Sequence, residues 1–232
     1  MLYLLNNSLE FPEPQFAEPD GLLAVGGDLR PDRLLAAYRR GIFPWYNDNS
    51  PILWWCPHPR LVLVPKDLHI AKSLRKVLRK QVFSIGFDTD FHGVIRLCAE
   101  TRLDTGGTWI TADMNRAYCR LFELGYAHCV EAWEDGELVG GIYGVAVGRA
   151  FFGESMFHLK PNASKVALVH LVRFLEHHGF HLIDCQQTTP HMLHFGATEW
   201  PRPSFLRALE SATVLDHLAG PWHTCEMPDF QW

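Results

Sequence analysis

The spacing of apolar residues changes at about Gly125 from a helical period to the period of strands. Before this point apolar residues recur every three or four positions, as in α-helices with one buried face. Together with residues that favour helix ends, this period predicts four helices, which start at Pro31, Ile70, Asp90 and Thr111 and end at Gly41, Lys80, Glu100 and Gly125.

After Gly125, apolar runs separated by glycine-containing turns predict a meander of three strands. These strands are expected at residues 127–133, 137–147 and 150–157. A long helix is expected at residues 162–179, followed by a buried strand at residues 180–185. Gln186 therefore lies just past the end of the last predicted strand.

Residues 1–60 differ from the rest of the chain in their prolines and short apolar runs. The segment Phe11–Pro19 contains three prolines, so it is expected to be an extended loop. Strands are expected at residues 50–55 and 60–64, on either side of a proline-rich corner. We therefore expect a small N-terminal domain at residues 1–60 and a larger domain at residues 61–232.

The composition of the 232 residues, with 47% hydrophobic and 20% charged side chains, excludes disordered and collagen-like chains. No apolar run reaches the roughly 18 residues that cross a bilayer, and the N-terminus lacks a secretory signal pattern. The six cysteines are scattered without a Cys-x-x-Cys motif, so we expect reduced, buried thiols and a cytoplasmic protein. The histidines and cysteines lack the paired spacing of a zinc site, so no metal is expected.

Two carboxylates stand in apolar strand segments. Glu154 lies within the third strand of the meander, and Asp184 lies near the end of the last strand. Burying an unpaired carboxylate costs several kcal/mol, so each must be paired, hydrogen-bonded or functional if it is buried. From the residues alone, an acidic site and a pair of solvated strand ends are both open interpretations.

One predicted helix carries a stripe of basic residues opposite its apolar face. The stripe consists of Lys72, Arg75, Lys76, Arg79 and Lys80. Solvated helix faces usually mix charges of both signs, whereas this region has no acid between Asp67 and Asp88. In a chain with a net charge of −5, such a local cationic face favours binding to a phosphate backbone.

Eight short motifs occur along the chain in a fixed order. They are Gly21-Leu-Leu-Ala-Val-Gly-Gly-Asp28, Arg40-Gly-Ile-Phe-Pro-Trp45, Ile52-Leu-Trp-Trp55, Gly107-Thr-Trp-Ile110, Glu137-Leu-Val-Gly-Gly141, Gly153-Glu-Ser-Met-Phe157, Asn162-Ala-Ser-Lys165 and Ile183-Asp-Cys-Gln186. Together they closely resemble the bacterial leucyl/phenylalanyl-tRNA–protein transferases. The resemblance covers nearly the whole chain, which makes it far more specific than any one motif.

The resemblance implies an α+β fold, in which a small N-terminal domain precedes an acetyltransferase-like domain with a mixed, mostly antiparallel sheet flanked by helices. It also implies transfer of leucine or phenylalanine, and less efficiently methionine, from aminoacyl-tRNA to proteins that begin with arginine or lysine. Such products are marked for degradation by the N-end rule. An acetyl-CoA substrate is disfavoured, because the connection from His158 to Lys165 has no glycine for binding pyrophosphate.

The resemblance further implies roles for particular residues. Asp184 is expected to accept the proton of the attacking amine through Gln186, and Glu154 and Asp184 are expected to hold the cationic acceptor. The aminoacyl side chain is expected in an apolar pocket of Ile142, Phe151, Met156, Leu171 and Leu175. The basic stripe is expected to bind tRNA phosphates, and Tyr38, Trp45 and Trp109 to contact the terminal adenosine. An ester donor is already activated, so no cofactor is expected.

Three alternatives remain open from the sequence. A related transferase would use charged tRNA but a cell-wall amine as acceptor. A non-catalytic tRNA-binding module would need the basic stripe without the acidic strand end. A nucleophilic pair of Cys185 with a histidine is less favoured, because alternation along the strand predicts that Cys185 faces the core, opposite to Asp184. No membrane or DNA partner is expected.

Overall fold

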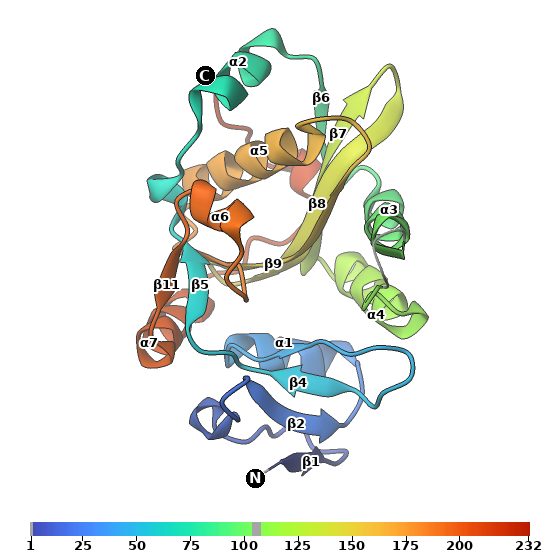
Figure 1. Ribbon diagram of the computed structural model, residues 1–232, viewed down its shortest axis with the longest axis vertical. Helices are drawn as coiled ribbons and strands as arrows, with labels where there is room; N and C mark the ends of the chain where they lie inside the picture. Colours follow the sequence, from blue (N-terminus) through green and yellow to red (C-terminus); the bar gives the residue numbers. More distant parts are fainter. Residues whose placement is uncertain (1, 104–107) are drawn as a thin grey trace.

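The computed structural model describes residues 2–103 and 108–232, whose strands form two sheets (Figure 1). Gly107, the first residue of one motif, lies outside the described residues. The smaller sheet has the strand order β1 (Tyr3–Leu5), β2 (Leu22–Gly26), β4 (Leu53–Trp55) and β3 (Phe43–Pro44). Only β1 and β2 run parallel in this sheet.

The larger sheet contains the predicted meander and the strand that follows it. Its order is β11 (Thr198–Trp200), β5 (Arg60–Leu63), β10 (Leu182–Asp184), β9 (Ala150–His158), β8 (Glu137–Val147), β7 (Ala127–Glu134) and β6 (Ser84–Phe87). All neighbours are antiparallel except β9 and β10, which the long helix α5 (Ala163–His177) connects. The predicted α+β fold with a mixed, mostly antiparallel sheet is thus confirmed.

The predicted helices are present, and shorter elements occur that the sequence pattern did not predict. The predicted helices are α1 (Pro31–Arg39), α2 (Lys72–Lys80), α3 (Phe91–Leu103), α4 (Ala112–Glu123) and α5. Additional elements include β6, β11, α6 (Pro190–His194), α7 (Arg202–Thr213) and the short 3-10 helices η1 (Pro14–Phe16), η2 (Pro65–Asp67) and η3 (Trp222–Thr224). Strands of three or four residues are too short to show a clear period, which explains why β6 and β11 were missed.

Capping residues begin two of the predicted helices as expected. The Thr111 side chain accepts a hydrogen bond from the Met114 amide at 3.2 Å, and Asp90 Oδ1 accepts one from the Gly93 amide at 2.9 Å. Each bond satisfies a backbone donor that the first turn of a helix leaves without a partner.

Helices cover both faces of the larger sheet. On one face α5 and α2 enclose an apolar core with residues such as Phe151 and Leu171. On the other face α1, α3, α4 and α7 form a second core, which also includes Trp54 of the smaller sheet. The smaller sheet shares this core with the larger one, so the core does not divide the chain into two domains. β5 begins the larger sheet at Arg60, close to the expected boundary, and the boundary at residue 60 stays a prediction.

A glycine allows α5 to approach the sheet closely. A Cβ atom at Gly140 would lie 2.5 Å from Ala163 Cβ, much nearer than van der Waals contact allows. The start of α5 therefore packs directly on β8, and this close approach explains the glycine at position 140 in the fifth motif.

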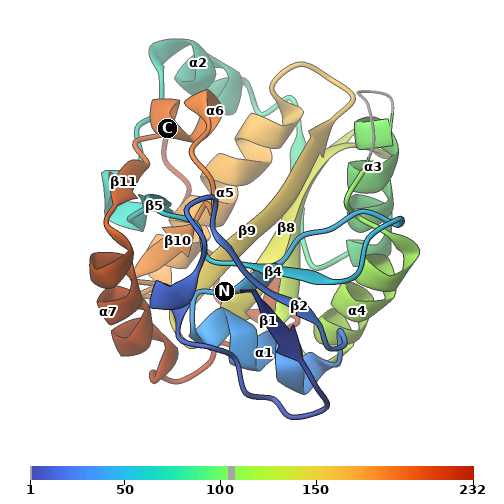
Figure 2. The same ribbon diagram turned by 60° about the horizontal axis from the view of Figure 1, so that its bottom comes forward.

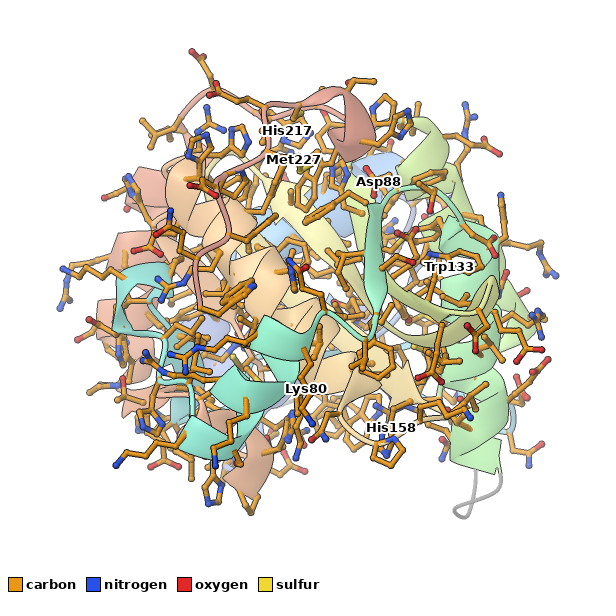
Figure 3. All side chains as sticks on the ribbon, turned by 90° about the horizontal axis from the view of Figure 1, so that it is seen from above. Lys80, Asp88, Trp133, His158, His217 and Met227 are labelled. Carbon is orange, nitrogen blue, oxygen red and sulfur yellow. The ribbon has the colours of Figure 1, made fainter. Side chains whose placement is uncertain are left out.

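After α7 the chain returns across the molecule and runs along α5, past Met227 (Figure 3). The buried Trp222 ring stacks on His128 at 3.8 Å between centroids, and its amide donates to Asp88 Oδ2 at 2.7 Å. Further along, the Phe230 and Trp232 rings flank His170 of α5. The C-terminal segment thus covers one end of the core beneath α5.

Candidate active site

Glu154 lies at an irregularity in the pairing of β8 and β9. Tyr143 pairs with Ser155, but the next residue, Gly144, pairs with Gly153, so Glu154 is one extra residue on β9. Such a β-bulge changes the direction in which a side chain points. It places the Glu154 carboxyl in the interior with only 8% of the residue exposed.

Two tyrosines surround the Glu154 carboxyl in a closed ring of short contacts. Tyr38 Oη lies 2.8 Å from Glu154 Oε1, Tyr118 Oη lies 2.9 Å from Oε2, and the two hydroxyls are 2.7 Å apart. Three hydrogen bonds need three hydrogens, and the two hydroxyls supply two of them. All three contacts can therefore be hydrogen bonds at once only when the Glu154 carboxyl is protonated and supplies the third hydrogen.

The burial of Glu154 and the charge of its neighbour Asp184 favour the protonated carboxyl. Burial raises the pKa of Glu154 to about 7, and the nearby Asp184 carboxylate adds to the rise, whereas hydrogen bonds from Tyr38, Tyr118 and Gln186 oppose it. Glu154 therefore exchanges its proton near neutral pH, which is the property of groups that act as acids or bases in enzymes.

Gln186 links the two carboxylates. Its backbone amide donates to Asp184 Oδ1 at 2.8 Å, and its side-chain Nε2 donates to Glu154 Oε1 at 3.0 Å. The residue has a φ of 61°, a left-handed conformation that costs a non-glycine residue roughly 1–2 kcal/mol. These hydrogen bonds hold that conformation, and they leave the Gln186 side-chain oxygen available to a ligand.

Asp184 forms a buried ion pair with Arg60. Arg60 Nε donates to Asp184 Oδ1 at 2.7 Å and Nη2 to Oδ2 at 2.6 Å, and both side chains are fully buried. The guanidinium lies between the rings of Phe43 and Phe205, 4.9 and 4.7 Å from their centroids. The expected relay from the amine through Gln186 to Asp184 stays a prediction, and the hydrogen bond between the Gln186 amide and Asp184 Oδ1 places these two residues in contact. With its carboxylate also bound to Arg60, Asp184 can position Gln186.

An apolar cavity of about 250 Å³ lies beside Glu154, and we call it the aminoacyl cavity after the side chain that the sequence resemblance predicts there. Four of the five residues expected around the donor side chain line it, namely Ile142, Phe151, Met156 and Leu171. The fifth, Leu175, is fully buried in the core and is not among the lining residues. The cavity wall also contains Leu168 and Ile183, which the sequence pattern marks only as core residues.

A second cavity of about 250 Å³ adjoins the first, and we call it the tryptophan cavity. Trp45 and Trp109 line it together with Glu154 and Gln186, as expected for residues near one site. Tyr38 does not fit the expected stacking role, because its ring is fully buried and its hydroxyl binds Glu154. The two cavities share the residues Arg102, Gly153, Glu154, Cys185 and Thr189.

Cys185 packs against the core beneath α5, on the strand face opposite to Asp184, as the alternation predicted. It also lines both cavities. Burial raises the pKa of the Cys185 thiol well above its usual value, with the Asp184 charge as a smaller cause. The thiol is therefore neutral at physiological pH and is not an activated nucleophile.

The predicted basic stripe is exposed along α2, while Leu74 and Leu78 on the opposite face are buried. Figure 1 places α2 and the smaller sheet at opposite ends of the longest axis, with the strands of the larger sheet between them. A ligand that contacts both α2 and Trp45 must therefore be long.

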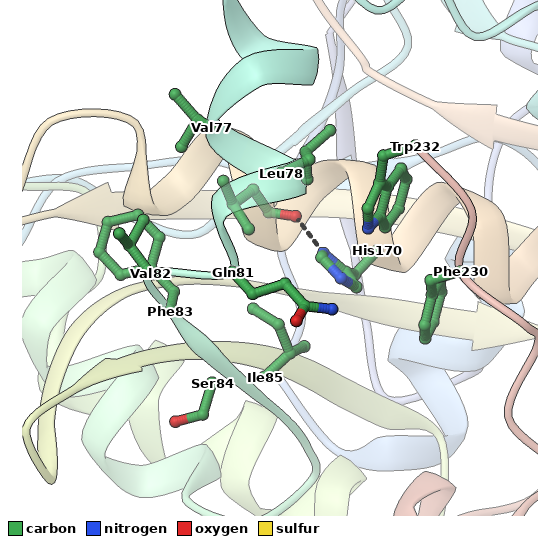
Figure 4. A pocket seen from close by; sticks show the side chains of 11 residues that line it. Val77, Leu78, Gln81, Val82, Phe83, Ser84, Ile85, His170, Phe230 and Trp232 are labelled. Carbon is green, nitrogen blue, oxygen red and sulfur yellow. Dashed lines mark hydrogen bonds between the residues drawn. The ribbon is translucent and has the colours of Figure 1, made fainter.

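A cavity of about 370 Å³ lies below α2, lined by the apolar residues Val77 and Leu78 and by the C-terminal aromatic rings (Figure 4). Its ionisable group is His170, whose Nδ1 lies 2.8 Å from the Val166 carbonyl. Burial lowers the pKa of His170, so its ring is neutral. The predicted site residues do not line this cavity, and it is separate from the acidic centre.

Within residues 2–103 and 108–232, no group of three or more histidine, cysteine or acidic side chains is arranged to hold a metal ion. In the same ranges, the helices are too short or too polar to cross a membrane. All six cysteines are free thiols, and Cys56, Cys98 and Cys129 are buried as expected, whereas the other three are partly exposed.

Comparison with known proteins identifies relatives over the whole chain. The family model "Leucyl/phenylalanyl-tRNA protein transferase" matches residues 62–210, and the model of that family's N-terminal domain matches residues 27–58. A leucyl/phenylalanyl-tRNA–protein transferase of Azoarcus sp. (strain BH72) is 56% identical over 234 residues and covers 100% of both chains. One of Syntrophobacter fumaroxidans is 60% identical over 209 residues, covering 90% of this chain and 89% of the relative.

Solved structures with a similar arrangement are distant in sequence. L-PGS from Bacillus licheniformis has a TM-score of 0.42 and 8% identity, covering 72% of this chain and 54% of that one. A GCN5-related N-acetyltransferase from Kribbella flavida has a TM-score of 0.30 and 11% identity, covering 73% of this chain and 60% of that one.

Proposed function

Because the chain belongs to the leucyl/phenylalanyl-tRNA–protein transferase family, it is an enzyme that moves aminoacyl groups from tRNA to proteins, and we propose its donors, acceptors and site residues. The donors are leucyl- and phenylalanyl-tRNA, with methionyl-tRNA used less well. The acceptors are cytoplasmic proteins whose first residue is arginine or lysine, and the modified proteins are then degraded by the N-end rule.

The observation that carries this proposal is the pair of adjoining cavities that share Glu154. The aminoacyl cavity is apolar and suits a leucine or phenylalanine side chain. The tryptophan cavity offers the rings of Trp45 and Trp109 to the terminal adenosine of the tRNA. The ester bond between these two parts of the donor then lies beside Glu154 and Gln186.

In the reaction we propose, the acceptor's α-amine attacks the carbonyl carbon of the ester. A new C–N bond forms, the C–O bond to the ribose breaks, and the amine proton passes to the released ribose oxygen. A free α-amine has a pKa near 8, so part of it is protonated at neutral pH. The Gln186 side-chain oxygen accepts a hydrogen bond from the amine and aligns it, while Asp184 and Arg60 position Gln186.

The Glu154 carboxylate attracts the cationic acceptor. When it ionises, its negative charge lies in a poorly solvated site, where attraction to an ammonium or guanidinium group is strong. The exposed cations of α2 bind tRNA phosphates, which explains how a net-acidic protein holds a polyanion. The ester is already activated, so the proposed reaction needs no nucleotide, metal or other cofactor.

The direct test is transfer of radioactive leucine from tRNA to a peptide that begins with arginine. The same peptide with an acetylated N-terminus, a peptide that begins with alanine, and a cell-wall amine precursor serve as comparisons. We expect label only on peptides with a free N-terminal arginine or lysine. Label on the cell-wall precursor instead would contradict the proposed acceptor.

The aminoacyl cavity also gives a prediction for donor choice. Leu171→Ala enlarges the cavity, so we expect the ratio of phenylalanine to leucine transfer to rise about 10-fold, since each methylene of fit is worth roughly 1–3 kcal/mol. Leu175→Ala is the matched control, because Leu175 is one helical turn away on α5 but lies outside the cavity wall. Both variants should lose stability, and an equal shift of the donor ratio in both would contradict the assignment.

A further inference from the structure

A fourth cavity, of about 290 Å³, is lined by residues of α2 and shares His191 with the aminoacyl cavity, and we call it the histidine cavity. Its wall comes from the start of α2, the start of α5 and the short helix α6, which is close to α2 in the view of Figure 2. His191 of α6 lines both the histidine cavity and the aminoacyl cavity. The histidine cavity therefore lies next to both the basic helix α2 and the aminoacyl cavity.

The polar groups that line this cavity are one lysine and several neutral side chains that can donate hydrogen bonds. They are His69, Ser73, Asn162, Lys165, His191 and His194, and the described residues of the wall include no acid. Neither α2 nor α5 has a side-chain cap at its N-terminus, and the capping residues Ala71 and Asn162 both line the cavity. The positive ends of two helix dipoles thus add to these side chains.

The hydrogen bonds of the histidines leave one nitrogen of each ring directed to other partners. His69 Nδ1 lies 3.0 Å from the His194 carbonyl, and His194 Nδ1 lies 2.5 Å from the Pro190 carbonyl. Each of these Nδ1 atoms must carry the hydrogen, because a carbonyl oxygen only accepts. The Nε2 atom of the same ring is then an acceptor in the neutral imidazole and a donor in the imidazolium, which is the form that a bound anion stabilises. His191 Nε2 is buried and has no hydrogen-bond partner among the described residues.

This arrangement is suited to an anion with several acceptor oxygens. Lys165 forms no ion pair with a described residue, although it is exposed at the start of α5. The histidines are not placed to chelate a metal ion together. An RNA phosphodiester supplies negative charge to Lys165 and acceptor oxygens to Lys165 and to those imidazoles that are protonated when the anion binds.

We propose that the histidine cavity binds a backbone phosphate of the tRNA 3′ strand, just upstream of the aminoacylated adenosine. This inference rests on the proposed function, which puts the aminoacyl group in the neighbouring cavity. The bound phosphate fixes the path of the single strand between α2, which holds the body of the tRNA, and the reaction centre. It thereby positions the ester beside Glu154.

Donors of increasing length test this proposal. The set consists of 3′-leucyl adenosine, leucyl-CA, leucyl-CCA and leucyl-tRNA, each assayed with an arginine-starting peptide. For the wild type, we expect KM to fall about 10-fold at the extension that adds the bound phosphate, as for a charge-assisted hydrogen bond. In Lys165→Gln and in His194→Gln, we expect most of this 10-fold fall in KM to disappear. Their kcat and their KM for leucyl adenosine should stay unchanged.

Three control variants separate this subsite from other effects. Lys160→Gln lies on the same connection but pairs with Glu134 at 3.7 Å, and His177→Gln lies at the far end of α5, so neither should change the step. Lys76→Glu on α2 should weaken binding of leucyl-tRNA and leave the short donors unaffected. Lys165 and His194 are exposed, and thermal unfolding will show that their variants remain folded.

Two results would overturn the proposal: an unchanged KM step in both cavity variants, or an equal loss with leucyl adenosine, which has no upstream phosphate. If the wild type transfers nothing from any donor, the proposed function fails instead. The cavity is then tested by the binding of unacylated CCA, which needs no transfer. Unaltered CCA affinity in Lys165→Gln and His194→Gln would again contradict the phosphate subsite.

Discussion

Glu154→Gln is expected to lower kcat/KM for an arginine-starting peptide about 100-fold while leaving the affinity for aminoacyl-tRNA unchanged. The substitution keeps the shape of the carboxyl and removes the charge that attracts the cationic acceptor. The fold should tolerate the substitution. The glutamine amide can donate a hydrogen to the hydroxyls of Tyr38 and Tyr118 in place of the protonated carboxyl.

The pH dependence gives this prediction a second measurement. With the Glu154 pKa at about 7, the wild-type kcat/KM for the acceptor should rise as pH increases through 7, because the carboxylate forms in that range. Ionisation of the acceptor amine, near pH 8, adds a further rise. Glu154→Gln should keep the rise near pH 8 and lose the one near pH 7.

The folding stability of the wild type should fall with rising pH, whereas its kcat/KM rises. The folded-state pKa of Glu154 lies above the ordinary glutamate value of 4.5, so the folded protein binds a proton more tightly than the unfolded chain. The stability gained from this proton is present below pH 4.5 and is lost as pH rises through about 7. The wild type should therefore lose stability relative to Glu154→Gln between pH 5 and pH 8, as measured by thermal unfolding.

Glu131→Gln provides the matched control. Glu131 is also a fully buried carboxyl of the larger sheet, and burial raises its pKa, but it binds the amides of Thr89 and Asp90 away from both cavities. Its variant should retain the wild-type preference for arginine and lysine. If Glu154→Gln uses the arginine peptide as well as the wild type does, Glu154 is not the acceptor site.

Asp184→Asn is expected to destabilise the protein by about 3–5 kcal/mol, because it leaves the buried Arg60 charge without a partner. For a chain of this length, such a loss lowers the Tm by on the order of 10 °C. The single-turnover transfer rate should also fall, because the unpaired Arg60 charge disturbs the strand end from which Asp184 positions Gln186. The single variant therefore mixes structural and chemical effects.

The double variant Arg60→Met with Asp184→Asn separates these effects. Methionine fills the space between the rings of Phe43 and Phe205 without a charge, and the asparagine oxygen still accepts the Gln186 amide. If Asp184 positions Gln186, we expect the double variant to recover most of the stability and a rate within about 10-fold of the wild type. A stable double variant that remains about 100-fold slow would show that the Asp184 carboxylate itself takes part in proton transfer.

The site residues show how far sequence reasoning reached. Glu154 and Asp184 were recognised because acids in apolar strands are costly unless they are paired or functional. The sequence could not reveal the bulge that turns Glu154 toward the tyrosines, since a bulge depends on the register between two strands. Likewise, Leu171 and Leu175 lie one turn apart on the same helix, and only the packed structure distinguishes cavity wall from core.

By itself, the sequence determined the main helices and the strand meander, the basic face of α2 and the family. These features depend on residues close together in the chain or on motifs in a fixed order. Only the tertiary structure decided which groups meet: Arg60 pairs with Asp184 across 124 positions, and Tyr38 reaches Glu154 across 116. Such pairings arise when elements pack, and no local period of the sequence records them. The chemical role of each carboxylate follows from these distant partners.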